Sequence, residues 1–356
     1  MRRILLEHYK RYPKMQIQDM VKLIYQNEFA GGHFITHEKE SLTFLQQEFH
    51  SLEDSLPDGE ETADTAFEEI GNGLCRLHLM PLRKASIRLE TVNRFFVNTA
   101  NSVQGSLQSF QKKLDIFRQC CRDQALPYPL EELEAYLDAY RRQGFPHVSH
   151  SEVYRAAYSP AYRVVKSQYR DYFELFCRID SLLGIKESVC VAIDGNSGAG
   201  KSSLATLIKE IYDCNVFHMD DFFLTPGLRT EERLKEVGGN VDYVRFRQEV
   251  IHGLRSGRAF RYRKYDCSKM AFDEPVTVTP ERLNIIEGCY SMHPTLIDFY
   301  DLKVFLGVDK KEQSARILKR NGPVMHKRFL LEWIPLEDEY FEKMNIPEKC
   351  DLVLDS

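Results

Sequence analysis

The chain has 356 residues, 43% of them hydrophobic and 28% charged, which is ordinary for a globular protein long enough to form two domains. Its 48 basic and 53 acidic residues give a net charge of −5, which argues against a dedicated nucleic-acid-binding protein. The 9 cysteines are scattered and form no Cys-x-x-Cys pair, so the sequence indicates reduced thiols rather than a disulfide framework or a zinc ribbon.

The N-terminus shows no signal-peptide pattern, and no apolar run approaches the about 18 residues that a membrane span needs. We therefore expect a cytoplasmic protein without a membrane partner. The sequence leaves open whether the protein forms a homo-oligomer.

The first half of the chain shows the apolar spacing that is typical of helices. Met20, Leu23 and Ile24 share one face of a predicted helix, and another helix is predicted to begin near Leu130. A longer helical pattern covers residues 161–183. These segments predict a mainly α-helical N-terminal domain of unknown role.

Residues 1–187 are assigned to this domain, and they contain no clear buried strand. Residues 52–64 include a Pro-Asp-Gly turn among acidic residues and are predicted to form an exposed loop. Residues 70–78 contain a glycine turn that leads into a candidate strand.

Two groups of side chains in this half have a functional interpretation and a structural one. His33 and His37 are four residues apart and would share one face of a helix, but the glycines before them and the lack of a following glutamate argue against a metal site. In residues 144–170, tyrosines alternate with arginines. Such a segment can bind bases and phosphates or form a packing face, and the acidic net charge favours packing.

From residue 188 onward, short apolar runs alternate with helical patterns. The runs lie at residues 189–193, 215–219, 283–286, 303–308 and 352–354. Strands that alternate with helices predict an α/β domain over residues 188–356, with a parallel sheet covered by helices on both faces.

The sequence Gly-Asn-Ser-Gly-Ala-Gly-Lys-Ser at residues 195–202 matches the phosphate-loop (P-loop) pattern G-x-x-x-x-G-K-[ST]. It follows a predicted strand and opens an apolar helix, which is the structural context that the pattern requires. Glycines let backbone N–H groups surround phosphates, and the helix N-terminus favours the same anion. Lys201 supplies a charge at the β- and γ-phosphates of ATP, and Ser202 offers a hydroxyl to Mg²⁺. The predicted nucleotide-binding residues are Gly195, Asn196, Ser197, Gly198, Ala199, Gly200, Lys201, Ser202 and Ser203.

Two carboxylates, Asp220 and Asp221, follow the second predicted strand. Ligands of open α/β sheets bind at the carboxyl ends of the strands. A carboxylate there can accept the proton of a hydroxyl that attacks the γ-phosphate. Asp220 is the candidate catalytic base, and the alternative is an aspartate that only caps a turn.

The phosphate loop together with Met-Asp-Asp-Phe-Phe at residues 219–223 resembles the uridine kinase family of P-loop kinases, which includes nicotinamide riboside kinase and is related to phosphoribulokinase. Residues 261–266 resemble the segment that lines the acceptor pocket in that family, residues 285–288 the strand that ends in Glu-Gly, and residues 316–320 the basic lid helix. The resemblance covers residues 188–356 only.

The resemblance implies a role for each matching residue. Asp220 corresponds to the general base, Glu287 to an acid near Mg²⁺ and the acceptor, and Arg316 and Arg320 to lid arginines that stabilise the transferring phosphoryl group. Ser202 and Glu287 are thus the candidate metal ligands. The catalytic set is Asp220, Lys201, Arg316 and Arg320, and the candidate acceptor-binding residues are Asp221, Asp242, Tyr265, Asp266 and Glu287.

Several of these residues also have structural interpretations. Glu287 could be a capping acid, Asp242 a helix cap, and the two arginines part of a solvated basic helix face. The chain also departs from uridine kinases, because Arg261 replaces a proline and Cys267-Ser268-Lys269-Met270 stands where those enzymes have a base-reading histidine. These departures put uridine specificity in doubt.

The sequence therefore predicts an ATP- and Mg²⁺-dependent kinase that phosphorylates a hydroxyl of a nucleoside-like or other small metabolite. One alternative is a nucleotide-dependent ATPase or switch with the N-terminal domain as its effector. Another is a kinase that reads nucleic acid through the Tyr/Arg-rich segment. The identity of the acceptor and the choice between ATP and GTP cannot be read from the sequence.

Overall fold

The computed structural model describes residues 1–32, 34–52 and 66–355. These residues form two compact units, Met1–Cys177 and Arg178–Ser356. The division lies within one helix, α9 (Phe173–Ile185). His33 and all but the first residue of the predicted loop at 52–64 lie outside the described residues.

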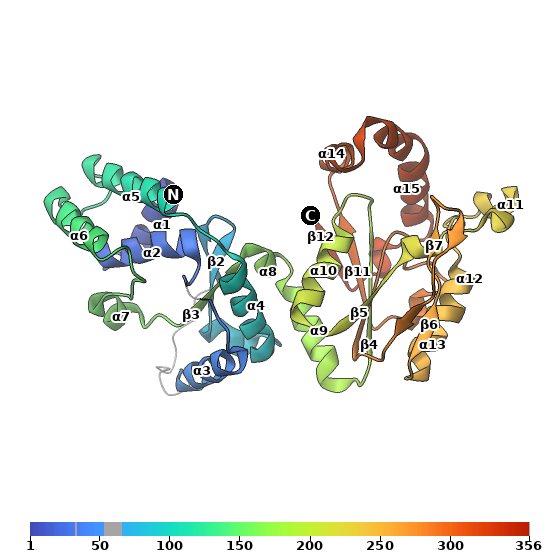
Figure 1. Ribbon diagram of the computed structural model, residues 1–356, viewed down its shortest axis with the longest axis horizontal. Helices are drawn as coiled ribbons and strands as arrows, with labels where there is room; N and C mark the ends of the chain where they lie inside the picture. The colour runs from blue at the N-terminus through green and yellow to red at the C-terminus, as the bar shows by residue number, and fades with distance from the viewer. Residues whose placement is uncertain (33, 53–65, 356) are drawn as a thin grey trace. The chain divides into compact units, whose positions relative to one another are not determined.

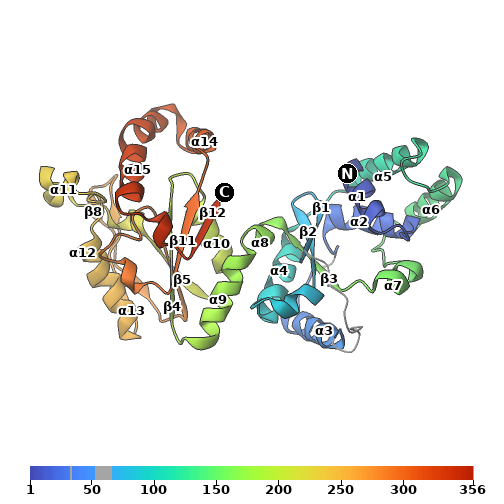
Figure 2. The same cartoon turned by 180° about the vertical axis from the view of Figure 1, so that it is seen from behind.

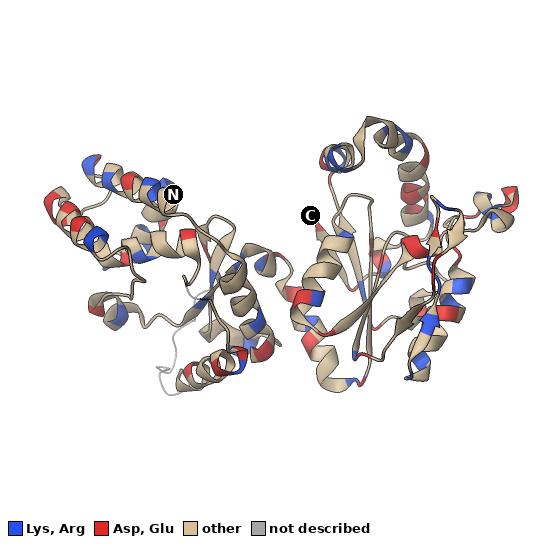
Figure 3. Cartoon of the chain, in the orientation of Figure 1, with Lys and Arg blue, Asp and Glu red and all other residues tan. Residues whose placement is uncertain are grey.

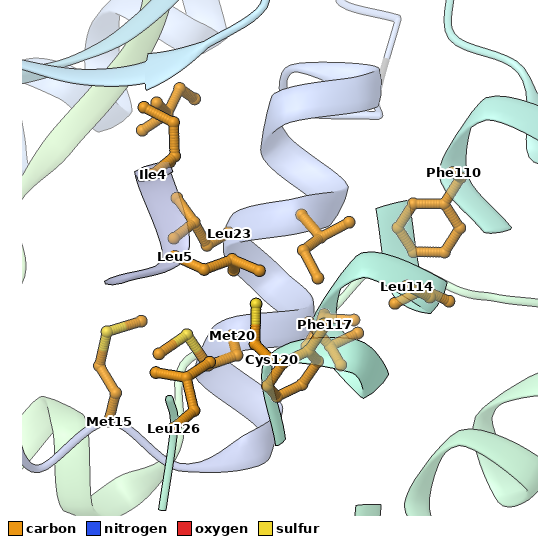
Figure 4. Close-up of a cluster of buried hydrophobic side chains, with 14 of the residues drawn as sticks. Ile4, Leu5, Met15, Met20, Leu23, Phe110, Leu114, Phe117, Cys120 and Leu126 are labelled. Carbon is orange, nitrogen blue, oxygen red and sulfur yellow. The ribbon is translucent and has the colours of Figure 1, made fainter. Parts of the chain in front are cut away.

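Helices make up most of the N-terminal unit, as predicted. They are α1 (Arg2–Arg11), α2 (Ile17–Phe29), α3 (Glu38–Ser51), α4 (Leu89–Ser102), α5 (Leu107–Arg122), α6 (Leu130–Arg142), α7 (Glu152–Tyr158) and α8 (Ser167–Asp171) (Figure 1). The apolar faces of α1, α2 and α5 meet in a buried cluster that includes Leu5, Leu23 and Phe117 (Figure 4). The predicted face of α2 is buried, because Met20, Leu23 and Ile24 are all fully covered.

The unit also contains a sheet that the sequence did not predict in full. Strands β1 (Phe67–Gly71), β2 (Leu74–His78) and β3 (Tyr162–Lys166) pair antiparallel in the order β1-β2-β3. The glycine turn at residues 70–78 does lead into a strand, but the absence of buried strands was a wrong prediction, because β2 is buried at four of its five positions.

The prediction of one helix over residues 161–183 is also wrong at its start. Tyr162–Lys166 is strand β3, and helix α9 begins only at Phe173. Val164 and Val165 are β-branched and buried, and the five residues pair with β2 along its whole length. Pairing with a distant strand therefore outweighs the local helical spacing of the apolar residues.

A buried ion pair joins β2 to β1, and the same arginine is hydrogen-bonded to α2. The Arg76 side chain is fully buried and donates to Glu68 Oε2 at 3.2 Å and to Gln26 Oε1 at 2.8 and 3.1 Å. Burial acts to raise the pKa of Glu68, but His78, whose Nε2 lies 3.7 Å from Glu68 Oε2, and the charge of Arg76 hold that pKa well below its usual range. Glu68 is therefore ionised and depends on Arg76 for charge compensation.

Replacing Arg76 with leucine is expected to destabilise the N-terminal unit by about 3–5 kcal/mol, because it leaves the Glu68 carboxylate buried without its main partner. Hydrogen–deuterium exchange of the 67–78 peptide measures the loss as faster exchange. Arg2→Leu is the control, since Arg2 forms an exposed pair with Asp123, and exposed ion pairs contribute little to stability. Equal exchange in the two variants would contradict the role of the buried pair.

A parallel sheet of five strands forms the centre of the C-terminal unit, in the order β12-β11-β4-β10-β5. The strands are β4 (Val189–Gly195), β5 (Cys214–His218), β10 (Leu283–Glu287), β11 (Leu302–Gly307) and β12 (Leu352–Asp355), at the five predicted positions. β4 and β10 are buried at every residue, which is typical of strands covered on both faces.

Helices flank this sheet on both sides, as predicted. α9 and α10 (Lys201–Ile211) lie on one side, and α12 (Tyr243–Phe246) and α13 (His252–Ser256) lie on the other (Figures 1 and 2). On the second side, Ala192 and Ile286 of the sheet share a buried cluster with Phe246 and Val250. The predicted α/β fold of the C-terminal half is confirmed.

The remaining elements lie around the edge of the sheet. They are α11 (Glu231–Lys235), the antiparallel pairs β6 (Phe260–Tyr262) with β9 (Val276–Val278) and β7 (Tyr265–Asp266) with β8 (Ala271–Phe272), and helices α14 (Lys310–Arg328) and α15 (Ile334–Lys343). Gly322 breaks α14 with a left-handed backbone (φ 74°). None of the helices in the described part of the chain is both long and apolar enough to cross a membrane.

Candidate active site

The phosphate loop joins the end of β4 to the start of α10. Gly195 and Gly200 have positive φ angles of 138° and 93°, and a Cβ atom on Gly195 would lie 2.0 Å from the carbonyl oxygen of Leu306. Only glycine fits at this close approach of β4 and β11. All nine predicted nucleotide-binding residues, 195–203, thus lie in this loop and the first turn of α10.

Lys201 folds back over the loop. Its Nζ donates to the carbonyl oxygens of Gly195 at 2.8 Å and Asn196 at 2.9 Å. Both partners are neutral, so the ammonium charge is not compensated by these contacts. A lysine held in this way can move to an incoming phosphate without breaking an ion pair.

Asp194, which the sequence interpretation missed, anchors the loop. It is fully buried and accepts hydrogen bonds from the backbone N–H of Gly195 at 2.8 Å, the N–H of Met292 at 2.9 Å and the hydroxyl of Tyr340 at 2.9 Å. Burial raises its pKa. The only signal in the sequence is an aspartate directly before the glycine loop.

The two predicted metal ligands lie next to each other. Ser202 Oγ donates to Glu287 Oε1 at 3.0 Å. Glu287 is the last residue of β10, and it is paired in register with His218 at the end of β5. His218 Nδ1 lies 2.5 Å from Glu287 Oε1, and this hydrogen bond raises the pKa of the imidazole.

A hydroxyl and a carboxylate are the hard oxygen donors that Mg²⁺ takes when it binds mainly through phosphates and water. The described residues contain no cluster of three or more His, Cys, Asp or Glu side chains that could hold a metal by themselves. The Ser202–Glu287 pair therefore fits a magnesium ion that arrives with a nucleotide, and does not fit a metal held by protein ligands alone.

Asp220 and Asp221 lie in the short 3₁₀ helix Met219–Phe222, directly after β5. Asp220 is exposed to solvent, but partial desolvation by the surrounding protein and the nearby charge of Glu287 raise its pKa, while the charge of Lys201 lowers it. Asp221 is instead paired with Lys264, whose Nζ lies 3.0 Å from its Oδ2. Of the two carboxylates, Asp220 is the one influenced by both the phosphate-loop lysine and Glu287.

The other predicted acceptor-binding residues are in different surroundings. Asp242 caps α12 by accepting from the backbone N–H of Arg245 at 3.0 Å. Asp266 accepts from the backbone N–H and the hydroxyl of Ser268 at 2.8 and 2.6 Å, and these bonds lower its pKa. Both carboxylates thus have local partners in a cap and a turn. Tyr265 is buried, and its hydroxyl makes no hydrogen bond within the described part of the chain.

Helix α14 carries the predicted lid arginines among other basic residues (Figure 3). Arg316 Nη1 donates to the carbonyl oxygen of Gly198 at 3.3 Å, so this arginine reaches the phosphate loop. Arg320 Nε instead donates to Asn321 Oδ1 on the same helix at 2.8 Å. Gln313, which was not predicted, donates to the carbonyl oxygen of Ser197 at 3.0 Å.

Glu337 is a second residue that sequence reasoning missed. From α15 it accepts from the backbone N–H of Ser197 at 3.0 Å and from the Ser197 hydroxyl at 2.5 Å. The side chain is buried, and burial raises its pKa. The Glu337 carboxylate therefore accepts a hydrogen bond from one of the loop N–H groups that are suited to binding phosphate.

Replacing Glu337 with glutamine is expected to tighten ADP binding about fivefold, since it removes about 1 kcal/mol of repulsion between two anions in the loop. Calorimetric titration with ADP measures the change, at a pH above the raised pKa of the carboxylate. Glu339→Gln is the control, because Glu339 lies on the same helix and pairs with Lys343 in solvent. Weaker ADP binding by Glu337→Gln would mean that the carboxylate organises the loop instead.

A parallel sheet with a phosphate loop, a serine–glutamate pair and a carboxylate at the carboxyl ends of neighbouring strands is the arrangement of a P-loop kinase. Residues 190–323 match the model of the Phosphoribulokinase / Uridine kinase family. This match confirms the resemblance for that part of the chain. It ends before α15, so Glu337 and Tyr340 lie outside it.

Solved structures are similar to the same half of the chain. A protein from Bacillus stearothermophilus, described as a possible uridine kinase, is 22% identical, with 53% of this chain and 100% of that chain covered and a TM-score of 0.40. A candidate fructose transport system kinase from Silicibacter sp. TM1040 is 24% identical, with 47% and 89% covered and a TM-score of 0.38. No curated protein matches the chain.

Proposed function

We propose that the protein is an ATP-dependent kinase that transfers the γ-phosphoryl group to a hydroxyl of a small metabolite. The contact between Ser202 and Glu287 at 3.0 Å carries this proposal. It joins the phosphate loop to the strand end beside Asp220, so a nucleotide-binding group and a candidate base share one edge of the sheet. We place the reaction in the cytoplasm, because all nine cysteines are free thiols.

The phosphates of ATP would lie in the loop of residues 195–203, on backbone N–H groups and the start of α10. Lys201 and Arg316 are the cations that reach this loop, and they would offset the charge of the transferring group. Ser202 and Glu287 would hold Mg²⁺, which supplies further charge neutralisation when bound.

Asp220 would take the proton of the acceptor hydroxyl. Partial desolvation and the charge of Glu287 raise its pKa, and a stronger base accepts a hydroxyl proton more readily. Glu287 would be a metal ligand, and before a metal binds its charge also raises the pKa of Asp220.

Tyr265 is the acceptor contact that the structure supports best among the predicted residues, because its buried hydroxyl lacks a partner among the described residues. Buried hydroxyl groups are normally hydrogen-bonded, so this one is available to a ligand. Asp221, Asp242 and Asp266 already have protein partners. We therefore assign these three aspartates to shaping the acceptor pocket rather than to direct contact with the acceptor.

The test is ATP consumption with a panel of acceptors that contains nucleosides, ribosides, sugars, polyols, pantothenate and hydroxy acids. The proposal expects ADP formation with one class of acceptor and a product heavier by one phosphoryl group in mass spectrometry. ATP turnover that no acceptor changes would instead support an ATPase or switch with the N-terminal unit as effector.

A further inference from the structure

The N-terminal unit contains a cavity of about 680 Å³ that the kinase proposal does not use. It lies beside α2, α3 and β3, and its apolar wall includes Phe34, Phe44 and Phe96. Phe34 and Phe44 are 73% and 66% exposed, which is unusual for side chains of this size. Exposed aromatic side chains on the wall of a cavity are typical of a ligand site.

A smaller cavity of about 390 Å³ adjoins the first and shares Lys22, His150 and Pro160 with it. Its other lining residues are Ser149, Arg155 and Ser159. This lining contains two basic side chains, Lys22 and Arg155, and two serines but no carboxylate. The combination favours an anionic group over a cationic or neutral one.

The two cations bind only neutral partners among the described residues. Lys22 Nζ donates to the carbonyl oxygen of Val148 at 2.9 Å. Arg155 donates through Nε and Nη2 to the carbonyl oxygen of His150 at 3.1 and 2.8 Å. Their charges are therefore available to a ligand. Arg163, on the side of the larger cavity, differs because it pairs with Glu48 at 2.7 Å.

A buried network fixes the wall between the cavities. His150 Nδ1 lies 2.9 Å from Asp19 Oδ1, and its Nε2 lies 2.6 Å from the hydroxyl of Tyr162. Burial lowers the pKa of His150 to about 4, so the imidazole is neutral at physiological pH. Asp19 also accepts from the backbone N–H and the hydroxyl of Ser151. The network holds Tyr162 and satisfies the Asp19 carboxylate through His150 and Ser151. Lys22 and Arg155 are therefore the cations of the smaller cavity.

We propose that the N-terminal unit binds a small phosphate monoester with an aromatic or apolar body. The phosphate would lie on Lys22 and Arg155 with the hydroxyls of Ser149 and Ser159, and the body would lie against Phe34, Phe44 and Phe96. Two cations and two hydroxyls suit a dianion better than a single carboxylate. This inference does not depend on the kinase activity of the other unit.

Calorimetric titration of the full-length protein with phenyl phosphate tests the inference. We expect inorganic phosphate and benzyl alcohol each to bind at least 10-fold more weakly, because each lacks one half of the ligand. Lys22→Gln and Arg155→Gln should each weaken phenyl phosphate binding at least 10-fold. Lys112→Gln should leave it unchanged, because Lys112 is exposed on α5.

A second readout separates a direct charge contact from a loss of structure. Burial and the charges of Arg76 and Arg155 lower the pKa of Lys22 to about 8, although Asp19 acts to raise it. A bound phosphate raises the pKa of an adjacent amine. At pH 8, phenyl phosphate should therefore bind with proton uptake, seen as a binding enthalpy that depends on the buffer, and Lys22→Gln should lose this dependence.

Lys201→Ala distinguishes this site from the phosphate loop. Binding that persists in Lys201→Ala and falls in Lys22→Gln supports the inference, whether or not the kinase proposal holds. The inference is overturned if phenyl phosphate does not bind, if benzyl alcohol binds equally well, or if Lys22→Gln binds like the unchanged protein. Salt-sensitive binding of an RNA oligonucleotide without phenyl phosphate binding would also overturn it, in favour of a nucleic-acid surface.

Discussion

Replacing Lys201 with alanine is expected to lower kcat/KM for phosphoryl transfer about 1000-fold, the upper range for one electrostatic group at a reacting centre. The ammonium is held by the carbonyl oxygens of Gly195 and Asn196, which place it over the loop where the phosphates would bind. Lys201 is the one lysine of the phosphate-loop sequence at residues 195–202, so no neighbouring lysine of the loop can replace its charge. The variant should stay folded, because the lost hydrogen bonds go to neutral carbonyl groups at a partly exposed site.

ADP release and product mass, measured with the acceptor found in the panel, give the loss. Lys209→Ala is the matched control, since Lys209 is an exposed lysine at the other end of the same helix, α10. Unchanged circular dichroism and unchanged thermal unfolding would show that the fold is intact. Turnover by Lys201→Ala within about threefold of the unchanged protein would refute the assignment of the loop, since one charge contributes more than this.

The C-terminal fold could be predicted from the sequence because its signals are local. β4 and β10 are buried at every position, so each appears as an uninterrupted apolar run. The phosphate loop has a fixed spacing of glycines, lysine and serine that few other structures require. In the N-terminal unit the signals conflict, since residues 162–166 fit a helical pattern and become a strand only through pairing with β2. A single sequence does not contain that pairing.

Some residues of the candidate site could likewise be predicted from the sequence, and others are revealed only by the fold. The phosphate-loop residues and Asp220 follow from spacing and from the ends of predicted strands, and Glu287 was added by the family resemblance. Glu337 could not be found, because it contacts Ser197 from 140 positions further along the chain. Asp194 and His218 have ordinary sequence surroundings, and only the fold shows that they hold the loop and Glu287.

The aspartates show why residue type alone is a weak guide. Asp220, Asp242 and Asp266 were all candidate site residues, and an aspartate at the start of a helix or turn satisfies backbone N–H groups as readily as it binds a ligand. The structure separates them by their partners. Asp242 and Asp266 accept nearby backbone N–H groups, whereas the pKa of Asp220 responds to Lys201 and Glu287.

Replacing Asp220 with asparagine is expected to lower kcat by a factor of about 10²–10⁴, the usual contribution of a general base, and to leave ATP binding nearly unchanged. Asparagine has the size of aspartate but cannot accept the hydroxyl proton. The unchanged enzyme should also lose activity toward acid, because the base must be ionised, and partial desolvation and Glu287 raise its pKa above the ordinary aspartate value. As the pH falls through this raised pKa, the active form disappears, and Asp220→Asn should lose this limb of the pH profile.

Single-turnover rates and calorimetric ATP titration separate the chemical step from nucleotide binding. Asp213→Asn is the matched control, because Asp213 is exposed and precedes β5, at the opposite end of the strand from Asp220. A loss of ATP affinity equal to the loss of kcat would assign Asp220 to nucleotide or metal binding. An acid limb that persists in Asp220→Asn would instead place the titrating base elsewhere, and Glu287, which bonds to both Ser202 and His218, would then be the group to change next.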